Sequence, residues 1–399
     1  MLRVLLDATA VPANRGGVGR YVDGLIPALV GNGIDLLVAC QPQEVAHYAE
    51  LSAAEPVAAP AASGHPAARL IWEQTGLARV IAAARPDVVH APHYTHAIAG
   101  RRPLVVTLHD ATFFTDPQVH SAAKGPFFRA ATKLALRRAA CCIVPSQATA
   151  DELVRVAGAD PARLQVAHHG VDHAVFTPPS ASARGAVRAR LGLDEARDYV
   201  AFLGTMEPRK NIPALIRGWV QACAGRPDPP ALVLAGASGW DTEVDSAIAQ
   251  VSPALTLVRT GYLPLNELAG LLGGATVVAY PSLAEGFGLP VLEAMACGAP
   301  VLTTRRTAMP EIGGDAVAYT EPDAPSIAAA LGALLDDPAR RATLAAAALV
   351  RAAQFTWDAC ALAHRRAYER AAGEGPRPWK AGLRREPALR APGAKRAQQ

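Results

Sequence analysis

The stretch Tyr280-Pro-Ser-Leu-Ala-Glu-Gly-Phe-Gly-Leu-Pro-Val-Leu-Glu-Ala-Met-Ala296 carries the strongest indication of the fold. An apolar strand pattern ends at Tyr280, a loop with two glycines follows, and a helix pattern begins near Pro290. Proline suits the first turn of a helix because its missing N–H has no partner there. This order of elements is typical of parallel α/β sheets, which bind ligands at the carboxyl ends of their strands.

Two carboxylates bracket this loop, which is suited to an anionic ligand. Gly286 and Gly288 allow the backbone to approach a ligand closely, and the helix start offers free N–H groups. Glu285 is placed to meet the reacting end of such a ligand, and Glu293 to accept hydrogen bonds from hydroxyls near its phosphates. The alternative is that Glu293 caps or solvates the helix start and that Glu285 is an ordinary loop carboxylate.

Short apolar runs alternate with Ala-rich helix patterns on both sides of this stretch, which predicts parallel sheets covered by helices on both faces. A weakly patterned segment at 177–183 separates two similar series of strands. We therefore predict an α/β protein with two doubly wound, Rossmann-like domains facing each other across a cleft. The predicted strands are Arg3–Asp7, Asp35–Cys40, Val88–Ala91, Leu104–Leu108, Cys142–Pro145, Leu164–Ala167, Tyr199–Leu203, Ala231–Ala235, Thr256–Thr260, Thr276–Tyr280, Pro300–Thr304 and Ala316–Thr320.

The same patterns predict the domain boundaries. Residues 1–175 are expected to form an N-terminal domain, 176–197 a linker, and 198–355 a C-terminal domain. A last helix is expected over 356–371. Residues 375–399 lack apolar periodicity and are expected to form a disordered basic tail.

Composition and charge exclude several classes of protein. Of the 399 residues, 51% are hydrophobic and 19% charged, so a large core can be buried and general disorder is excluded. The net charge of +4 is uneven, because residues 375–399 hold seven basic residues and one acidic residue, a net of +6. The remaining −2 on residues 1–374 gives no support to nucleic-acid binding. Six cysteines without a CxxC pair, no signal peptide and no apolar run of about 18 residues predict a cytoplasmic protein.

Three further motifs follow predicted strands. Phe202-Leu-Gly-Thr-Met-Glu-Pro-Arg209-Lys210-Asn211 combines a glycine turn with two cations that can bind a diphosphate, or it is a solvated turn. Asn14-Arg-Gly16-Gly17-Val-Gly19-Arg20 precedes a helix and suits an anion, but it lacks the third glycine of a dinucleotide fingerprint. His109-Asp110 follows another strand, where the alternative is a satisfied interior imidazole beside a loop cap.

A metal centre is not predicted. His90, His93 and His96 have a spacing that might hold zinc, but they span a strand end and a loop without an added carboxylate. The chain also contains no Asp-x-Asp, the motif of metal-dependent GT-A transferases.

The stretch from Pro281 to Val301 resembles the Glu-x7-Glu signature of retaining GT-B glycosyltransferases of family 4, also called glycosyl transferases group 1. The resemblance extends over residues 1–371. It implies that the N-terminal domain lies on the acceptor side, that the C-terminal domain binds the nucleotide sugar, and that the helix over 356–371 crosses back to the N-terminal domain. It implies that His109 is catalytic with Asp110 in support, and that Glu285 contacts the donor sugar. The donor-binding residues that it implies are Gly16, Gly17, Gly204, Arg209, Lys210, Leu263, Phe287, Gly288, Leu289 and Glu293.

The resemblance also implies a reaction. It predicts transfer of a hexose, with retention, from a nucleoside diphosphate sugar to a hydroxyl of a glycan or glycolipid in cell-envelope or polysaccharide biosynthesis, without metal or cofactor. The motifs Leu6-Asp-Ala-Thr9, Trp72-Glu-Gln74 and His109-Asp-Ala-Thr-Phe-Phe114 resemble the bacterial mannosyltransferase-like branch, which favours GDP-mannose. The alternatives are a UDP-glucose or UDP-GlcNAc donor, or a non-catalytic scaffold that binds nucleotide sugars. The basic, amphipathic segment 124–138 is expected to pack on the first domain with its cations solvated, and the alternative is docking on an anionic membrane. The basic tail suggests peripheral association with the inner face of the plasma membrane, where a lipid acceptor would reside.

Overall fold

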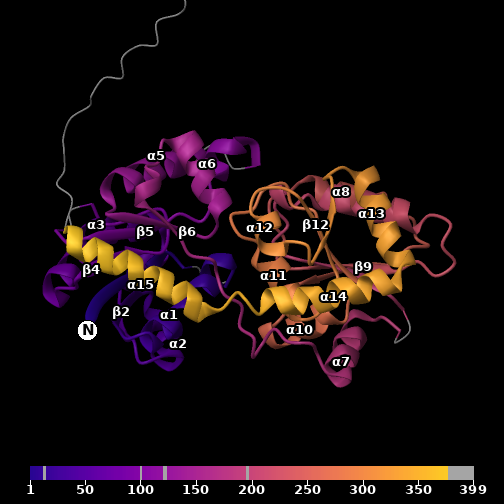
Figure 1. Cartoon of the computed structure of the whole chain (residues 1–399), viewed down its shortest axis with the longest axis horizontal. Coiled ribbons are helices and arrows are strands. Elements are labelled where there is room, and N and C mark those ends of the chain that lie inside the picture. Colours follow the sequence, from indigo (N-terminus) through magenta and orange to yellow (C-terminus); the bar gives the residue numbers. More distant parts are fainter. Residues whose placement is uncertain (12–14, 99–100, 120–123, 195–196, 376–399) are drawn as a thin grey trace, which may run out of the picture.

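The computed structural model describes residues 1–11, 15–98, 101–119, 124–194 and 197–375. Within these ranges the chain forms two parallel sheets, each covered by helices on both faces (Figure 1). The predicted α/β fold class with two doubly wound domains is confirmed. The basic tail predicted for 375–399 lies outside the described residues, except for Gly375.

The first sheet has seven strands in the order β3-β2-β1-β4-β5-β6-β7, all parallel. The order reverses between β1 and β4, where Val4 pairs with Val88. Side chains on both faces are apolar because helices cover both, which explains the continuous apolar runs in the sequence. The strands are β1 Leu2–Asp7, β2 Ile34–Cys40, β3 Glu55–Ala58, β4 Val88–Ala91, β5 Leu104–Thr107, β6 Cys141–Val144 and β7 Leu164–Val166.

The second sheet repeats this plan with six parallel strands in the order β10-β9-β8-β11-β12-β13. Its order reverses between β8 and β11, where Val200 pairs with Val277. Such a reversal opens a crevice at the carboxyl ends of the strands, and ligands bind there. The strands are β8 Tyr199–Leu203, β9 Ala231–Ala235, β10 Leu257–Gly261, β11 Val277–Tyr280, β12 Val301–Thr304 and β13 Ala318–Thr320.

In the described part of the chain, helices connect the consecutive strands of each domain, except β4 and β5, and bury their apolar faces on the sheets. Those of the first domain are α1 Gly17–Gly31, α2 Val45–Leu51, α3 Pro66–Ala84, α4 Thr112–Thr115, α5 Lys124–Arg138 and α6 Gln147–Ala157. Those that follow are α7 Ala181–Leu191, α8 Ile212–Cys223, α9 Glu243–Ala249, α10 Leu265–Gly273, α11 Leu289–Ala296, α12 Met309–Gly313, α13 Ala324–Asp336, α14 Pro338–Ala352 and α15 Trp357–Glu374.

The last helix leaves the second domain and packs on the first. Figure 1 shows α14 over the second sheet and α15 continuing across the first. Glycines permit the close approach: a Cβ on Gly24 of α1 would lie 2.1 Å from the Trp357 ring. Inside this contact, the Tyr21 hydroxyl is 2.7 Å from Nε2 of His364, and both side chains are fully buried. The two domains are therefore joined by two chain crossings, at about 170 and 355.

Two elements differ from the expectations. The strand β3 was not predicted, because it lies at the sheet edge and its Glu55 and Ala58 are exposed. The predicted linker 176–197 contains a helix, α7, which packs on α10 through the buried Val187 and Leu191. With only two core-facing side chains, α7 has the weak apolar pattern from which a linker was expected.

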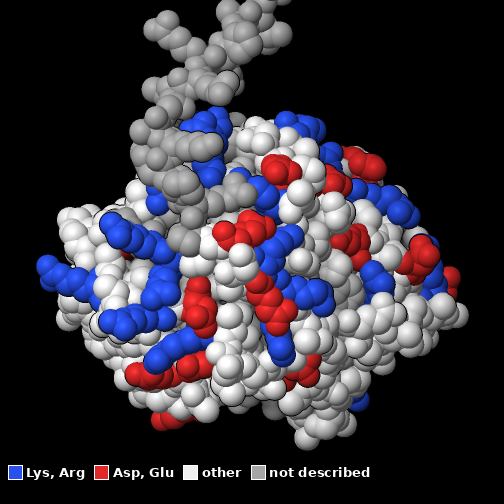
Figure 2. Space-filling model, turned by 60° about the vertical axis from the view of Figure 1, so that its left-hand side comes forward, with Lys and Arg blue, Asp and Glu red and all other residues white. Residues whose placement is uncertain are grey.

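Lys and Arg side chains are interspersed with Asp and Glu over the face shown in Figure 2. None of the helices in the described part of the chain is long and apolar enough to cross a membrane.

Candidate active site in the interdomain cleft

A cavity of about 360 Å³ opens between the domains at the carboxyl ends of both sheets. Loops after β1 and β5 enter it from the first domain, and loops after β8, β9, β10 and β11 from the second. Twelve of the thirteen predicted site residues line it: Gly16, Gly17, His109, Asp110, Gly204, Arg209, Lys210, Leu263, Glu285, Phe287, Gly288 and Leu289. The remaining predicted residue, Glu293, is not among the described residues that line the cavity.

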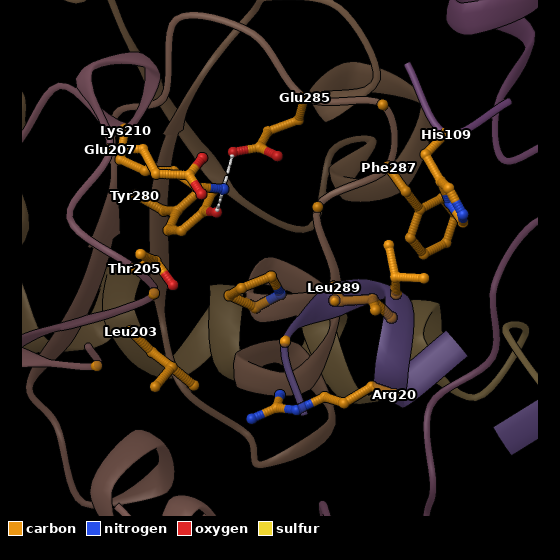
Figure 3. A pocket seen from close by; sticks show the side chains of 18 of the residues that line it. Arg20, His109, Leu203, Thr205, Glu207, Lys210, Tyr280, Glu285, Phe287 and Leu289 are labelled. Carbon is orange, nitrogen blue, oxygen red and sulfur yellow. Dashed lines mark hydrogen bonds and ion pairs between the residues drawn. The ribbon is translucent and has the colours of Figure 1, made fainter. Parts of the chain in front are cut away.

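The two predicted diphosphate-binding cations both contact Glu285, and Figure 3 shows Lys210 beside it. Arg209 donates a hydrogen bond of 2.5 Å to Oε2 of Glu285, and Lys210 pairs with its Oε1. A second carboxylate, Glu207, accepts a 2.8 Å bond from Nε of Arg209. Two carboxylates therefore balance the charge of the two cations. From the sequence, Glu285 was expected to contact a sugar, whereas in the structure it forms ion pairs with both cations.

Burial and charge set the ionisation of this cluster. Burial alone would raise the pKa of Glu285, but Arg209, Lys210 and hydrogen bonds lower it to about 2. The Ser282 hydroxyl contributes at 2.7 Å from Oε1, and the Tyr280 hydroxyl lies 3.0 Å from the same atom. Burial and the nearby Arg209 lower the pKa of Lys210. Glu285 is therefore a carboxylate at neutral pH.

Backbone geometry brings the loops close together around the cavity. Gly204 and Gly236 end β8 and β9 with φ of 156° and 130°, and a Cβ on Gly236 would lie 2.2 Å from the Gly204 carbonyl oxygen. Gly288, with φ of 101°, precedes the first turn of α11, which begins at Leu289. The start of α11 therefore faces the cavity with N–H groups suited to an anion.

His109 approaches from the first domain. Its Nε2 lies 2.7 Å from the carbonyl oxygen of Pro92, which can only accept, so Nε2 carries the proton. Burial lowers the pKa of His109, and the ring is neutral at pH 7. Its neighbour Asp110 accepts hydrogen bonds from the backbone N–H and hydroxyl of Thr112, at 3.1 and 2.8 Å, and so caps the turn after β5.

Glu293 lies behind the cavity wall and contacts the first domain. Its Oε1 forms an ion pair with Arg20 of α1, and Arg20 lines the cavity. The other oxygen, Oε2, is buried and has no hydrogen-bond partner in the described part of the protein. A buried carboxylate oxygen without a partner is costly, so this atom is suited to a hydroxyl group of a ligand.

Sequence reasoning missed several residues of the site. Arg20, Glu207 and Tyr280 stand within the quoted motifs but were not selected as site residues. His169 was not selected either, but its ring lies 4.7 Å from that of Tyr21 and 4.8 Å from that of Phe287. These aromatic rings connect the first domain to the loop that follows β11, and no local sequence pattern reveals such a contact.

The three spaced histidines do not converge on one point. Within the described ranges, no group of three His, Cys, Asp or Glu side chains has metal-binding geometry. His90 is instead buried among hydrogen bonds to Thr107 and Tyr368, each of 2.8 Å.

Comparison with known proteins agrees with this geometry. Residues 15–175 match the family model "Glycosyltransferase Family 4", and residues 183–351 match "Glycosyl transferases group 1". The chain is 31% identical to the O-antigen chain mannosyltransferase B of Escherichia coli over 64% of this chain and 67% of that protein. It is 38% identical to a D-inositol 3-phosphate glycosyltransferase of Kineococcus radiotolerans over 55% of this chain but only 54% of the relative.

Solved structures share the fold. The sucrose-phosphate synthase of Thermosynechococcus elongatus superposes with a TM-score of 0.74 and 22% identity, covering 94% of this chain and 100% of that one. The arrangement of two Rossmann-like sheets is therefore the GT-B fold that was predicted.

Proposed function

The chain belongs to glycosyltransferase family 4, and we propose that it transfers mannose, with retention, from GDP-mannose to a hydroxyl of a glycan or glycolipid. The observation that carries the proposal is the convergence of Glu285, Arg209 and Lys210 with His109 in one cleft. The donor identity is supported by the similarity to the E. coli mannosyltransferase, which covers 67% of that relative.

In the proposed reaction, the second domain holds the leaving group. Arg209, Lys210 and the start of α11 surround the position for a diphosphate, and such preorganised charges stabilise a departing anion by several kcal/mol. In the structure, both cations form ion pairs with Glu285. We propose that donor phosphates take over these contacts and release the Glu285 carboxylate toward the sugar.

The first domain completes the site. Glu285 then orients the sugar and stabilises the positive charge that develops at its anomeric carbon. The neutral His109 lies on the side of the cavity away from Lys210 (Figure 3). The acceptor hydroxyl attacks from the face that the diphosphate leaves, and the departing phosphate takes its proton, so that the configuration is retained. Glu293, through its unpartnered oxygen, is proposed to bind the ribose hydroxyls.

The donor experiment is a panel of GDP- and UDP-sugars with purified protein, followed by nucleoside diphosphate release and donor-dependent thermal shift. We expect the largest shift and turnover with GDP-mannose. Turnover with UDP-sugars alone would replace the donor assignment, and folded protein that binds no sugar nucleotide would refute the function. A second acceptor class, a phosphorylated polyol, is favoured by the 38% identity to the D-inositol 3-phosphate glycosyltransferase, so inositol 3-phosphate belongs in the acceptor panel.

We also propose that α5 contacts an anionic membrane in which a lipid acceptor resides. The helix packs on its domain through Gly125, Thr132 and Ala135 and exposes Phe127, Lys133 and Arg137. Each exposed cation near an anionic surface contributes about 1 kcal/mol. Sedimentation with vesicles containing phosphatidylglycerol should be weakened when Lys133 and Arg137 are replaced by glutamine.

A further inference from the structure

The start of α6 reaches across the cleft and contacts Gly286 in the loop between β11 and α11. Ser146, the N-cap of α6, accepts the N–H of Thr149 and donates a 2.7 Å hydrogen bond to the carbonyl oxygen of Gly286. The Thr149 hydroxyl donates to the same oxygen at 3.2 Å. Ser146 and Thr149 belong to the first domain and Gly286 to the second, so these bonds exist only when the cleft is closed. Both hydroxyl-bearing residues are buried.

A carboxylate from the second domain completes the contact. Glu311 of α12 accepts the backbone N–H of Gln147 at 2.8 Å and that of Ala148 at 3.2 Å. These N–H groups have no partner within α6, because the first turn of a helix lacks preceding carbonyls. Nε2 of His168 lies 2.6 Å from the same carboxylate. Besides its own N-cap, Ser146, α6 therefore receives a second capping side chain from the opposite domain.

The backbone of α12 at Glu311 is held in place by its own domain. Arg351 donates to the carbonyl oxygens of Glu311 and Ile312, at 2.6 and 3.1 Å. Charge-assisted hydrogen bonds to helix N–H groups are among the stronger polar contacts of proteins. Ser146, Thr149 and Glu311 lie outside the described cavity lining.

The contact fixes the distance between the two halves of the site. Gly286 directly follows Glu285, and a Cβ on Gly286 would lie 1.7 Å from the carbonyl oxygen of His109. Holding the Gly286 carbonyl on α6 therefore holds Glu285 and His109 at their working separation. We propose that Ser146, Thr149 and Glu311 are positioning residues that lock the domains in the closed arrangement required for transfer. The inference rests on the proposed function for its kinetic consequence.

The test replaces Glu311 by glutamine, which removes the charge and keeps the shape. We expect kcat to fall about tenfold, while the Kd for GDP stays within about twofold because the nucleotide site is untouched. The matched control is Asp337→Asn, since Asp337 caps α14 at 2.8 Å within a single domain. It should lower thermal stability to a similar degree without lowering kcat. If Glu311→Gln lowers kcat no more than the control does, the proposal is refuted.

A second variant extends the kinetic test, and a second measurement does not depend on activity. Thr149→Val retains the shape and removes one hydroxyl bond, and we expect kcat to fall about threefold. Small-angle X-ray scattering of the ligand-free proteins should show a larger radius of gyration for Glu311→Gln than for wild type. An unchanged radius would refute the lock. Failure of the wild type to bind GDP or UDP would refute the proposed function and leave this scattering result interpretable.

Discussion

Replacing Gly286 by alanine tests the closed cleft most directly. The three atoms nearest to the added Cβ are the carbonyl oxygen and carbon of His109, at 1.7 and 2.8 Å, and Cβ of Asp110, at 3.1 Å. All three belong to the first domain, whereas Gly286 belongs to the second. The backbone at Gly286 lies outside the left-handed region, so alanine is acceptable there within its own domain. The substitution therefore clashes only across the cleft.

The size of the effect follows from the overlap. Ordinary van der Waals contact begins near 3.4 Å, so Gly286 and His109 must separate by about 1.7 Å. Overpacking of a tight contact typically costs about 1–3 kcal/mol. Here the cost falls on the closed arrangement, because separation of the two domains relieves the clash. A misplacement of about 1 Å between reacting groups can cost about 10²-fold in rate. We expect kcat of Gly286→Ala to fall by at least about 10²-fold, with little change in melting temperature or in the Kd for GDP.

The assay is nucleoside diphosphate release at saturating donor, with thermal unfolding and GDP titration on the same preparation. Gly185→Ala is the control, because nothing lies within 4 Å of its added Cβ. Gly185 lies within α7, where its replacement by alanine should raise the free energy of unfolding by up to about 1 kcal/mol. Wild-type kcat in Gly286→Ala would show that the closed arrangement is not the reactive one. A large fall in melting temperature would contradict a clash confined to the cleft.

Other predictions concern charge and packing. Glu285→Gln should fold and lose at least about 10²-fold in transfer, as expected for loss of one electrostatic stabiliser, and near-normal turnover would contradict its role. Since the pKa of Glu285 is about 2 in the folded protein against 4.5 ordinarily, its contribution to stability should be complete above about pH 4.5 and lost toward pH 2. Urea unfolding of wild type and Glu285→Gln across this range measures it, and a difference that does not shrink on acidification would contradict the ion pairs. Because Arg209 and Lys210 are expected to neutralise the diphosphate, EDTA should leave turnover unchanged, and loss restored by Mg²⁺ would refute this. Gly24→Ala should lower the free energy of unfolding by about 1–3 kcal/mol, because its Cβ would meet the Trp357 ring, and an unchanged urea midpoint would contradict that packing.

Much of the architecture was predictable because buried parallel strands are continuous apolar runs. The strand β8, Tyr199–Leu203, is buried at every position and was predicted with the same limits. The strand β3 was not, because an edge strand with exposed Glu55 and Ala58 carries neither a buried run nor a regular alternation. Similarly, α7 inserts only Val187 and Leu191 into the core, too few for a clear helical period.

The loops that line the site were predictable from the sequence, but the pairs of side chains that contact each other in it were not. The position of a loop follows from the strand before it, and twelve predicted residues do line the cavity. The pairing of Arg20 with Glu293 joins residues 273 positions apart, and the Glu311 cap joins opposite domains. Such contacts depend on how the two finished domains approach each other, which no local pattern encodes. The ion pairs of Glu285 with Arg209 and Lys210 also depend on the directions of the three side chains, which no local pattern encodes.

The position of α15 has a consequence for synthesis of the protein. The buried core of the first domain includes Cys360, Ala361 and Tyr368 of this helix. Strand β1 is synthesised before the rest of the two domains, but the domain that it begins lacks part of its interior until residues near 374 have emerged. The second domain, whose strands span 199–320, is by contrast translated without interruption. Of the two domains, the one begun first is thus completed last, and the face of α1 that packs on α15 has no cover until α15 has been synthesised.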